Sequence, residues 1–306
     1  MSIESMKMDF HDAIKNAYMT KVPLIVVEGK DDLPVYISLL ENKERRFNVK
    51  PVQFFKNSGS GCHEIERNII SINERYPQGH IVYNYFKGIV DRDVKEYRNE
   101  LVERDGMFYL NSYSFENNFV TTKSIVNTVR LLTSLSSEQL DEALTEQAVK
   151  FINEQFVDFY YVVLEALRNA IEADYDGLVG FSEGYQELLI NPVKKIELMG
   201  KRSDLDVFAS KHGVSCDCIL KMKHFCKGKW HLRYFLQSLI NFTNSLHTIC
   251  GKELVKCPIC ESGRQDSCMY KKTTPLDVSG LIKVIKDNIN NADLDYLRKE
   301  IFNLAG

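Results

Sequence analysis

The sequence has 306 residues, of which 44% are hydrophobic and 26% are charged. This is the composition of a folded globular protein rather than a disordered chain, and the length predicts one large or two modest domains. The formal net charge of −3 excludes a protein that coats nucleic acid through bulk positive charge, so any site for a polyanion is expected to be local.

The sequence also bears on where the protein works. It has no apolar run close to the ~20 residues that a membrane-spanning helix needs. Its first residues, MSIESMKMDFHDAIKN, lack the basic stretch and apolar core of a secretory signal. Seven of the eight cysteines lie between residues 216 and 268, which in a cytosolic protein indicates metal binding more than disulfides. We therefore expect a cytoplasmic protein with no membrane partner.

From residue 22 to about 120, short apolar runs alternate with amphipathic stretches. We predict strands in LIVV (24–27), VKPVQFF (49–55), KGIVD (87–91) and GMFYLN (106–111), with helices at 31–42 and 62–76. Strands that alternate with helices are typical of a parallel sheet with right-handed crossovers. The predicted fold class is therefore α/β, with a parallel sheet flanked by helices.

Beyond about residue 120, the predicted elements are all helices. Apolar residues at i, i+3 and i+4 spacing predict helices within 121–135, 138–173, 202–213, 230–246, 278–290 and 292–304. We expect an α/β domain over residues 1–125 and a mainly α-helical region over 126–306, with a soft boundary because no low-complexity linker separates them.

Acidic residues follow three of the predicted strands. Glu28 follows LIVV, Asp91 and Asp93 follow GIV, and Glu116 lies beyond FYL. The carboxyl ends of parallel strands meet at one edge of a sheet, where ligands usually bind. Asp91 and Asp93, two residues apart on an extended segment, can point to the same side and grip one hard cation. Two Mg²⁺ or Mn²⁺ ions at such an edge would suit phosphodiester chemistry.

The order VVEGKDD, IVDRD, FENNF resembles the Toprim domain, in which a glutamate follows a first strand and Asp-x-Asp follows a later one. The spacing from Glu28 to Asp32 and the later Glu116 resemble Toprim nucleases of the "overcoming lysogenization defect" (OLD) type. Their stand-alone relatives, which include the effector nuclease of the PARIS anti-phage system, are similar too. The resemblance covers residues 22–120 well and 225–240, where KGK precedes a hydrophobic helix, weakly.

The resemblance implies metal ligands at Glu28, Asp32, Asp91, Asp93 and Glu116. Glu28 would also act as general acid or base, Asp91 and Asp93 would hold the principal metal, and Asp32 and Glu116 a second one. Asp31 does not keep the spacing. Any one of these acids alone could instead cap the positive end of the next helix. Taken together and in this order, we interpret Glu28, Asp91 and Asp93 as a metal site.

A basic and aromatic segment, KMKHFCKGKWHLRYF (221–235), is the best candidate surface for nucleic acid. Cations bind phosphates, and interleaved aromatic rings can stack on unpaired bases. The predicted nucleic-acid contacts are Arg92, Lys221, Lys223, Lys227, Lys229, Trp230 and Arg233. By the resemblance, Lys229 would also be catalytic and stabilise developing charge. The alternative is a solvated amphipathic helix, in which Phe235 and Leu236 belong to the core.

The resemblance implies a metal-dependent endonuclease that acts as the toxic effector of an abortive-infection response. An ABC-type ATPase sensor subunit would restrain it until a phage-encoded trigger acts through that partner, and the free nuclease could form a homodimer. The aromatic and basic segment favours RNA, tRNA included, over DNA. A DNA-nicking or primase-like Toprim enzyme stays open, as does a non-catalytic binding module in which the acids are helix caps.

Two further motifs have alternatives of their own. NSGSGCHE (57–64) either cradles a phosphate at a helix start or is a simple capped turn, and it lacks the GK[ST] ending of a P-loop. In CGKELVKCPICESGRQDSC, a CxxC pair with two flanking cysteines is a candidate structural zinc site: Cys250, Cys257, Cys260 and Cys268. His247 or Cys226 could replace one ligand, and reduced, unliganded thiols are the alternative.

Overall fold

The computed structural model describes residues 7–41, 45–136, 138–287 and 292–305. The chain divides into two compact units. The first comprises Met1–Arg92, Asn99–Asn111 and Lys286–Gly306, and the second Asp93–Arg98 and Ser112–Ile285. This differs from the predicted division in two respects: the chain enters the helical unit before residue 125, and its C-terminal segment belongs to the first unit.

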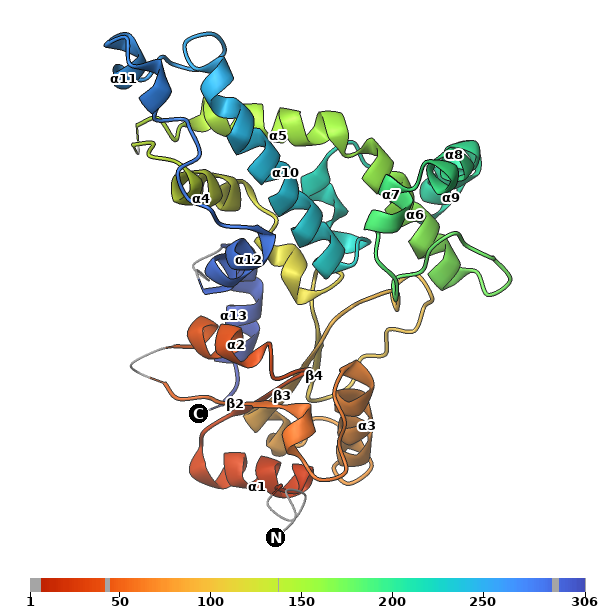
Figure 1. The fold of residues 1–306 in the computed structure, drawn as a ribbon. Helices are drawn as coiled ribbons and strands as arrows, with labels where there is room; N and C mark the ends of the chain where they lie inside the picture. Colours follow the sequence, from red (N-terminus) through yellow and green to blue (C-terminus); the bar gives the residue numbers. More distant parts are fainter. Residues whose placement is uncertain (1–6, 42–44, 137, 288–291, 306) are drawn as a thin grey trace. The chain divides into compact units, whose positions relative to one another are not determined.

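The first unit contains a four-stranded sheet whose neighbouring strands are all parallel. Its strands are β1 (Leu24–Val27), β2 (Asn48–Pro51), β3 (Phe86–Val90) and β4 (Met107–Tyr109), in the order β2-β1-β3-β4 (Figure 1). All four residues of β1 are buried, as an apolar run in a sheet covered on both faces requires. The predicted α/β class and parallel sheet are confirmed.

Helices cover both faces of this sheet (Figure 1). On one face, α1 (Phe10–Thr20) and α3 (Cys62–Asn73) pack their apolar sides onto a core that includes Leu24, Val26 and Phe86. On the other face lie α2 (Leu33–Leu39) and α13 (Asp295–Phe302). Lys87 of β3 forms a 2.8 Å ion pair with Glu300 of α13, which fixes that helix against the strand.

Helix α1 was missed by the sequence analysis, although the sequence carries a signal for it. Asp9 accepts hydrogen bonds from the backbone N–H groups of His11 and Asp12, as an N-cap does. The buried side chains that follow, Phe10, Ala13, Ile14 and Ala17, keep the i, i+3, i+4, i+7 spacing of an amphipathic helix.

The second unit is helical, as predicted. Its helices are α4 (Thr122–Leu132), α5 (Glu142–Gln155), α6 (Val157–Ile171), α7 (Gln186–Ile190), α8 (Pro192–Gly200), α9 (Arg202–His212), α10 (Gly228–Ile249), α11 (Pro258–Glu261) and most of α12 (Val278–Asp287). The stretch predicted as one helix over 138–173 forms two, α5 and α6, which meet at Phe156. The longest helix of the described chain, α10, packs against α4 and α5. None of the helices in the described ranges is both long and apolar enough to cross a membrane.

Candidate functional site

Two of the predicted acids meet at the carboxyl edge of the sheet. Glu28 follows β1 and Asp91 follows β3, and these strands are parallel neighbours. The backbone N–H of Asp91 donates a 2.8 Å hydrogen bond to Oε1 of Glu28. The chain runs from β1 to β2 on one side and then crosses back to β3 on the other, so this pair lies at a topological switch point. In open parallel sheets, that is where ligands bind.

Asp32 stands at the N-cap of α2 but does not cap it. Its side chain makes no hydrogen bond to the first turn of this described helix, and its Oδ2 instead accepts the backbone N–H of Gly29 at 3.0 Å. Asp32 is therefore not a hydrogen-bonding cap of α2. Its carboxylate holds the turn that follows Glu28, while Asp31 is exposed.

The pKa of Tyr36 shows that this edge of the sheet carries negative charge. Burial raises the pKa of this tyrosine well above its usual value, and the negative charges of Asp91, Asp32 and Glu28 raise it further. Three carboxylates therefore act on one buried side chain of α2. This local negative charge, with oxygen atoms as the donors, suits a hard divalent cation such as Mg²⁺ or Mn²⁺.

Asp93 and Glu116 belong to the second unit. β3 ends at Val90, and Asp93 has a φ of +48°, in the left-handed region, so the extended segment predicted to carry Asp91 and Asp93 is not present. The backbone N–H of Asp93 donates to the carbonyl of Tyr113 at 2.7 Å. Glu116 lies in the 3₁₀ helix η4 (Phe115–Phe119) and is buried.

The FENNF segment docks onto the start of α10, a contact that the sequence analysis did not foresee. The N–H of Gly228 donates to Oγ of Ser114 at 3.1 Å, and that hydroxyl lies 3.1 Å from Oδ1 of Asn117. Nδ2 of Asn117 in turn donates to the Cys226 carbonyl and lies 3.0 Å from Nδ1 of His231. FENNF and KGK, two of the segments that enter the resemblance, are thus joined within the second unit.

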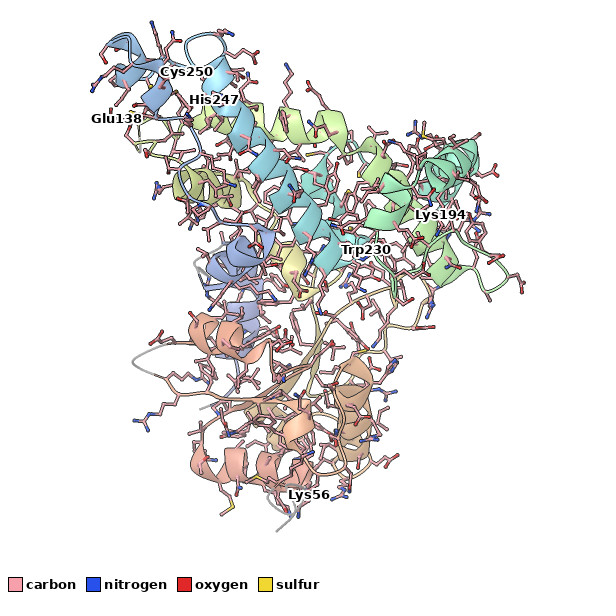
Figure 2. All side chains as sticks on the ribbon, viewed as in Figure 1. Lys56, Glu138, Lys194, Trp230, His247 and Cys250 are labelled. Atoms are coloured by element: carbon pink, nitrogen blue, oxygen red, sulfur yellow. The ribbon has the colours of Figure 1, made fainter. Side chains whose placement is uncertain are left out.

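The basic segment divides into buried and exposed residues. Trp230, labelled in Figure 2, is 5% exposed and packs edge-on against Phe181. The prediction that its ring contacts nucleic acid is contradicted, because only 5% of this residue is exposed. Lys229 and Arg233 are exposed one turn apart on α10, as phosphate-binding side chains need to be.

Lys227 is under the electrostatic influence of Asp93 and Glu116, the two predicted acids that belong to the second unit. It is half-buried, and its ammonium group donates to the Phe181 carbonyl. Burial and the charge of Lys229 lower its pKa, while the charges of Asp93 and Glu116 oppose that change.

The remaining predicted nucleic-acid contacts are placed as follows. Lys221 is exposed and forms a 2.6 Å ion pair with Asp217, while Lys223 is half-buried. In the first unit, Nε of Arg92 donates to the Leu110 carbonyl at 3.0 Å, just beyond β4. Contact of these three residues with nucleic acid stays a prediction.

The glycine-rich turn enters α3 at Gly61, and no side chain caps this helix start. Oε2 of Glu64 in α3 accepts the N–H of Gly59 at 3.0 Å, and the N–H of Gly61 donates to the Glu28 carbonyl at 3.0 Å. The N–H groups of Gly59 and Gly61 therefore have protein partners, and Glu64 adds a negative charge. These contacts argue against a phosphate cradle, and the predicted side-chain cap of α3 is not present either.

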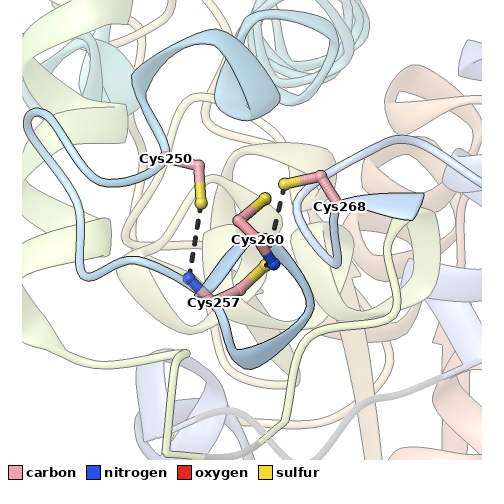
Figure 3. Close-up of side chains that lie close together, drawn as sticks. All are labelled: Cys250, Cys257, Cys260 and Cys268. Carbon is pink, nitrogen blue, oxygen red and sulfur yellow. Dashed lines mark hydrogen bonds between the residues drawn. The ribbon is translucent and has the colours of Figure 1, made fainter. Parts of the chain in front are cut away.

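The four cysteines of the predicted zinc site come together in the second unit. The Sγ atoms of Cys250, Cys257, Cys260 and Cys268 all lie within 4.8 Å of one another and could hold a metal ion (Figure 3). Cys250 follows the end of α10, and Cys257 and Cys260 frame the start of α11. The suggested substitutes are not part of this group: the thiol of Cys226 faces the Lys227 carbonyl, and His247 is exposed on α10.

The thiols differ in acidity. Burial alone would raise the pKa of Cys257, but hydrogen bonds from backbone N–H groups, those of Met269 and Cys260, outweigh it and lower that pKa to about 7. Burial raises the pKa of Cys268.

A second group of possible ligands, Asp9, His11 and Asp12, lies at the start of α1. Two of its members have structural roles. Asp9 caps α1, and the ring nitrogens of His11 contact the Tyr76 hydroxyl at 2.8 Å and the Arg75 guanidinium at 3.0 Å. These contacts account for the positions of the Asp9 and His11 side chains.

A scan against protein-family models finds no family that matches this chain, and a search of curated proteins finds no match either. Any function must therefore be argued from the residues at the carboxyl edge of the sheet and from the motifs of the sequence.

Proposed function

We propose that this protein is a metal-dependent endonuclease that hydrolyses phosphodiester bonds. The observation that carries the proposal is the pairing of Glu28 with Asp91 at the switch point between β1 and β3. With Asp32 nearby, these carboxylates offer the hard oxygen ligands that Mg²⁺ or Mn²⁺ prefers. One or two such ions supply Lewis-acid and nucleophile activation when bound.

The residues of the chain would have different roles in this reaction. Asp91 would hold the principal ion, and Glu28, whose Oε1 accepts the Asp91 N–H, would be oriented toward the same space. Asp93, Glu116 and Lys229 belong to the second unit and enter the proposal through the sequence resemblance alone. The four-cysteine group lies outside this chemistry, because four thiolates around a structural zinc ion leave no open coordination position.

The biological setting also comes from the resemblance alone. The combined motifs resemble AriB, the Toprim effector of the PARIS anti-phage system. We accordingly propose a toxic effector of abortive infection that an ABC-type ATPase sensor restrains until a phage protein triggers release. The proposed substrate is RNA, with tRNA favoured, and the exposed Lys229 and Arg233 are proposed to bind its phosphates. A homodimer of the free nuclease is part of the same proposal, as is a cytoplasmic location.

A non-catalytic binding module is the second candidate. One observation favours it: Glu28 and Asp32 each already accept a backbone N–H, as carboxylates that only hold turns would do. A DNA-nicking or primase-like Toprim enzyme would use the same acids on another substrate.

The test compares total RNA and plasmid in cells that produce the protein, its ATPase partner and a phage trigger. Glu28→Gln keeps an oxygen for the Asp91 N–H while it removes the charge, and Asp91→Asn is its counterpart. Asp31→Asn, at an exposed neighbouring acid outside the proposed ligand set, is the matched control. We expect discrete RNA fragments with the wild type and with Asp31→Asn. Mutation of a residue that only hydrogen-bonds to a metal ligand typically lowers metal affinity or activity by about 10–100-fold. Loss of the charge of a ligand itself should therefore abolish the RNA fragments.

The outcomes separate the candidates. If the plasmid is nicked while the RNA stays intact, the substrate is DNA and not RNA. If neither is cut, or if Glu28→Gln cuts as well as the wild type, the nuclease proposal fails. With purified protein, Mn²⁺ should raise the melting temperature of the wild type but not of Asp91→Asn, because a ligand that binds only the folded state stabilises it.

A further inference from the structure

The segment that follows α10 has a core made largely of sulfur. Within residues 251–270, all of which the structure describes, the buried side chains are Leu254, Cys257, Cys260, Cys268 and Tyr270. Every residue from 261 to 267 is exposed. So little aliphatic surface is buried that hydrophobic packing alone is a weak reason for this segment to keep one conformation. Small structures of this kind usually rely on a disulfide or a metal.

The sulfur distances separate these two possibilities. Sγ of Cys257 and Sγ of Cys268 lie 3.9 Å apart, and all four cysteines are unbonded thiols. A disulfide has an S–S distance of about 2.05 Å. In a tetrahedral zinc site with Zn–S bonds of about 2.3 Å, the sulfur atoms lie about 3.8 Å apart. The observed spacing matches the edge of a zinc tetrahedron.

The backbone around the cysteines is shaped to hold them. Gly251, directly after Cys250, has a φ of +78°, and Gly263, three residues after Cys260, has a φ of +84°. Such left-handed positions suit glycine and allow the chain to turn tightly after a cysteine. Figure 3 shows the backbone N–H of Cys257 directed at Sγ of Cys250, at 3.4 Å.

A second amide completes this support. The N–H of Cys260 points at Sγ of Cys257, also at 3.4 Å. Donors aimed at sulfur stabilise thiolates and orient them toward a metal.

We propose that Cys250, Cys257, Cys260 and Cys268 bind one Zn²⁺ as four thiolates in a closed, structural site. The ion joins the end of α10 to the segment that returns along α4. That segment is attached by two backbone hydrogen bonds, from the Ser134 N–H to the Met269 carbonyl at 3.2 Å and from the Thr273 N–H to the Leu132 carbonyl at 2.8 Å. This inference does not depend on the proposed nuclease activity.

The first test measures metal in the full-length protein, purified without an affinity tag and under reducing conditions. We expect one zinc ion per chain, and Co²⁺ exchanged into the site should give the intense absorption of a tetrahedral thiolate complex. Protein that carries no zinc and gains no such spectrum with Co²⁺ would overturn the proposal. In a second preparation without reductant, a protein mass lower by two hydrogens and a linked Cys257–Cys268 peptide would show a disulfide in place of the metal.

The second test asks whether the ion holds the segment closed. Lys252, Lys256 and Arg264 are exposed within it and are trypsin sites. Removal of zinc by a strong chelator should speed cleavage after these residues at least tenfold, and added zinc should restore protection. Cys257→Ser should be cut as fast as the chelated wild type, whereas Cys218→Ser, which alters a thiol outside the group, should keep both zinc and protection. Equal cleavage with and without zinc would contradict the structural role.

Discussion

At the scale of single residues, His231 shows how burial fixes both a tautomer and a charge. Its Nε2 lies 2.7 Å from the Ile219 carbonyl, which can only accept, so Nε2 carries the proton. Nδ1 is then the acceptor for the Asn117 side chain at 3.0 Å. Both nitrogens are satisfied in the neutral ring, and burial lowers the pKa of His231 from 6.5 to about 4. The histidine is therefore a neutral link between η4 and α10.

This pKa predicts a loss of stability in mild acid. The unfolded chain takes up the proton near pH 6.5, before the folded protein does, so the contribution of His231 is complete above pH 6.5 and falls as the pH drops toward 4. The full loss is on the order of 3 kcal/mol. The measurement is the free energy of unfolding in urea at pH 7.5 and pH 5.

His231→Gln should lose less stability than the wild type between these two pH values, because glutamine keeps a donor and an acceptor but does not titrate. His247→Gln, at an exposed histidine on the same helix, should behave as the wild type does. An equal loss in wild type and His231→Gln would show that this histidine is not protonated on unfolding.

Some residues of the candidate site could be predicted from the sequence and others could not, for physical reasons. Glu28 and Asp91 were predictable as neighbours because parallel strands bring their carboxyl ends to one edge. The left-handed φ of Asp93 was not, because a single backbone angle has no periodic signature. Trp230 was wrongly predicted to contact nucleic acid, because the order of basic and aromatic residues along a chain does not show which face of a helix is buried.

At the scale of elements, the junction between η4 and α10 depends on the absence of a side chain at Gly228. A Cβ there would lie 2.1 Å from Oγ of Ser114 and 3.0 Å from Oδ1 of Asn117. These are the atoms that join the two elements, so neither can move without breaking a hydrogen bond. The KGK motif is therefore explained in part by packing, whatever its lysines do.

Gly228→Ala should destabilise the protein by about 1–3 kcal/mol, the usual cost of forcing an extra group into a well-packed site. The readout is the midpoint of urea unfolding followed by the fluorescence of Trp230, the sole tryptophan, which lies two residues away. Gly200→Ala is the control, because no atom lies within 4 Å of its added Cβ and alanine should be neutral or slightly stabilising. An unchanged midpoint in Gly228→Ala would show that the Ser114 side chain can move away from the added methyl group without loss of stability.

The positions of most elements were predictable, and their ends and breaks were not. Strand β1 and helix α10 followed from an apolar run and from helical spacing. The break between α5 and α6 at Phe156 interrupts a hydrophobic pattern that continues across it, so periodicity alone could not locate it. The cysteine group was predictable from the CxxC pair, but the choice of Cys250 over His247 required the turn that follows α10.

At the scale of the whole molecule, the chain leaves the first unit and returns to it at the end. The sequence assigned residues 292–304 to the helical region because helical spacing says nothing about which core a helix joins. In the structure, α13 covers one face of the sheet through contacts that local sequence cannot report. Phe302 packs edge-on against Phe47 with ring centroids 5.1 Å apart, and Tyr296 lies against Phe108 of β4.

This return predicts that a substitution near the C-terminus weakens a sheet whose first strand begins at residue 24. Ile301 on α13 is fully buried, and Ile301→Ala should cost about 2–5 kcal/mol through lost burial and the cavity left behind. Lys299→Ala, at an exposed position of the same helix, should stay within about 0.5 kcal/mol. Because a protein with two units need not unfold in one step, hydrogen exchange of each segment is the measurement. Ile301→Ala should speed exchange in β1 and β3 and leave α10 as protected as before, whereas faster exchange in α10 alone would place α13 in the helical unit.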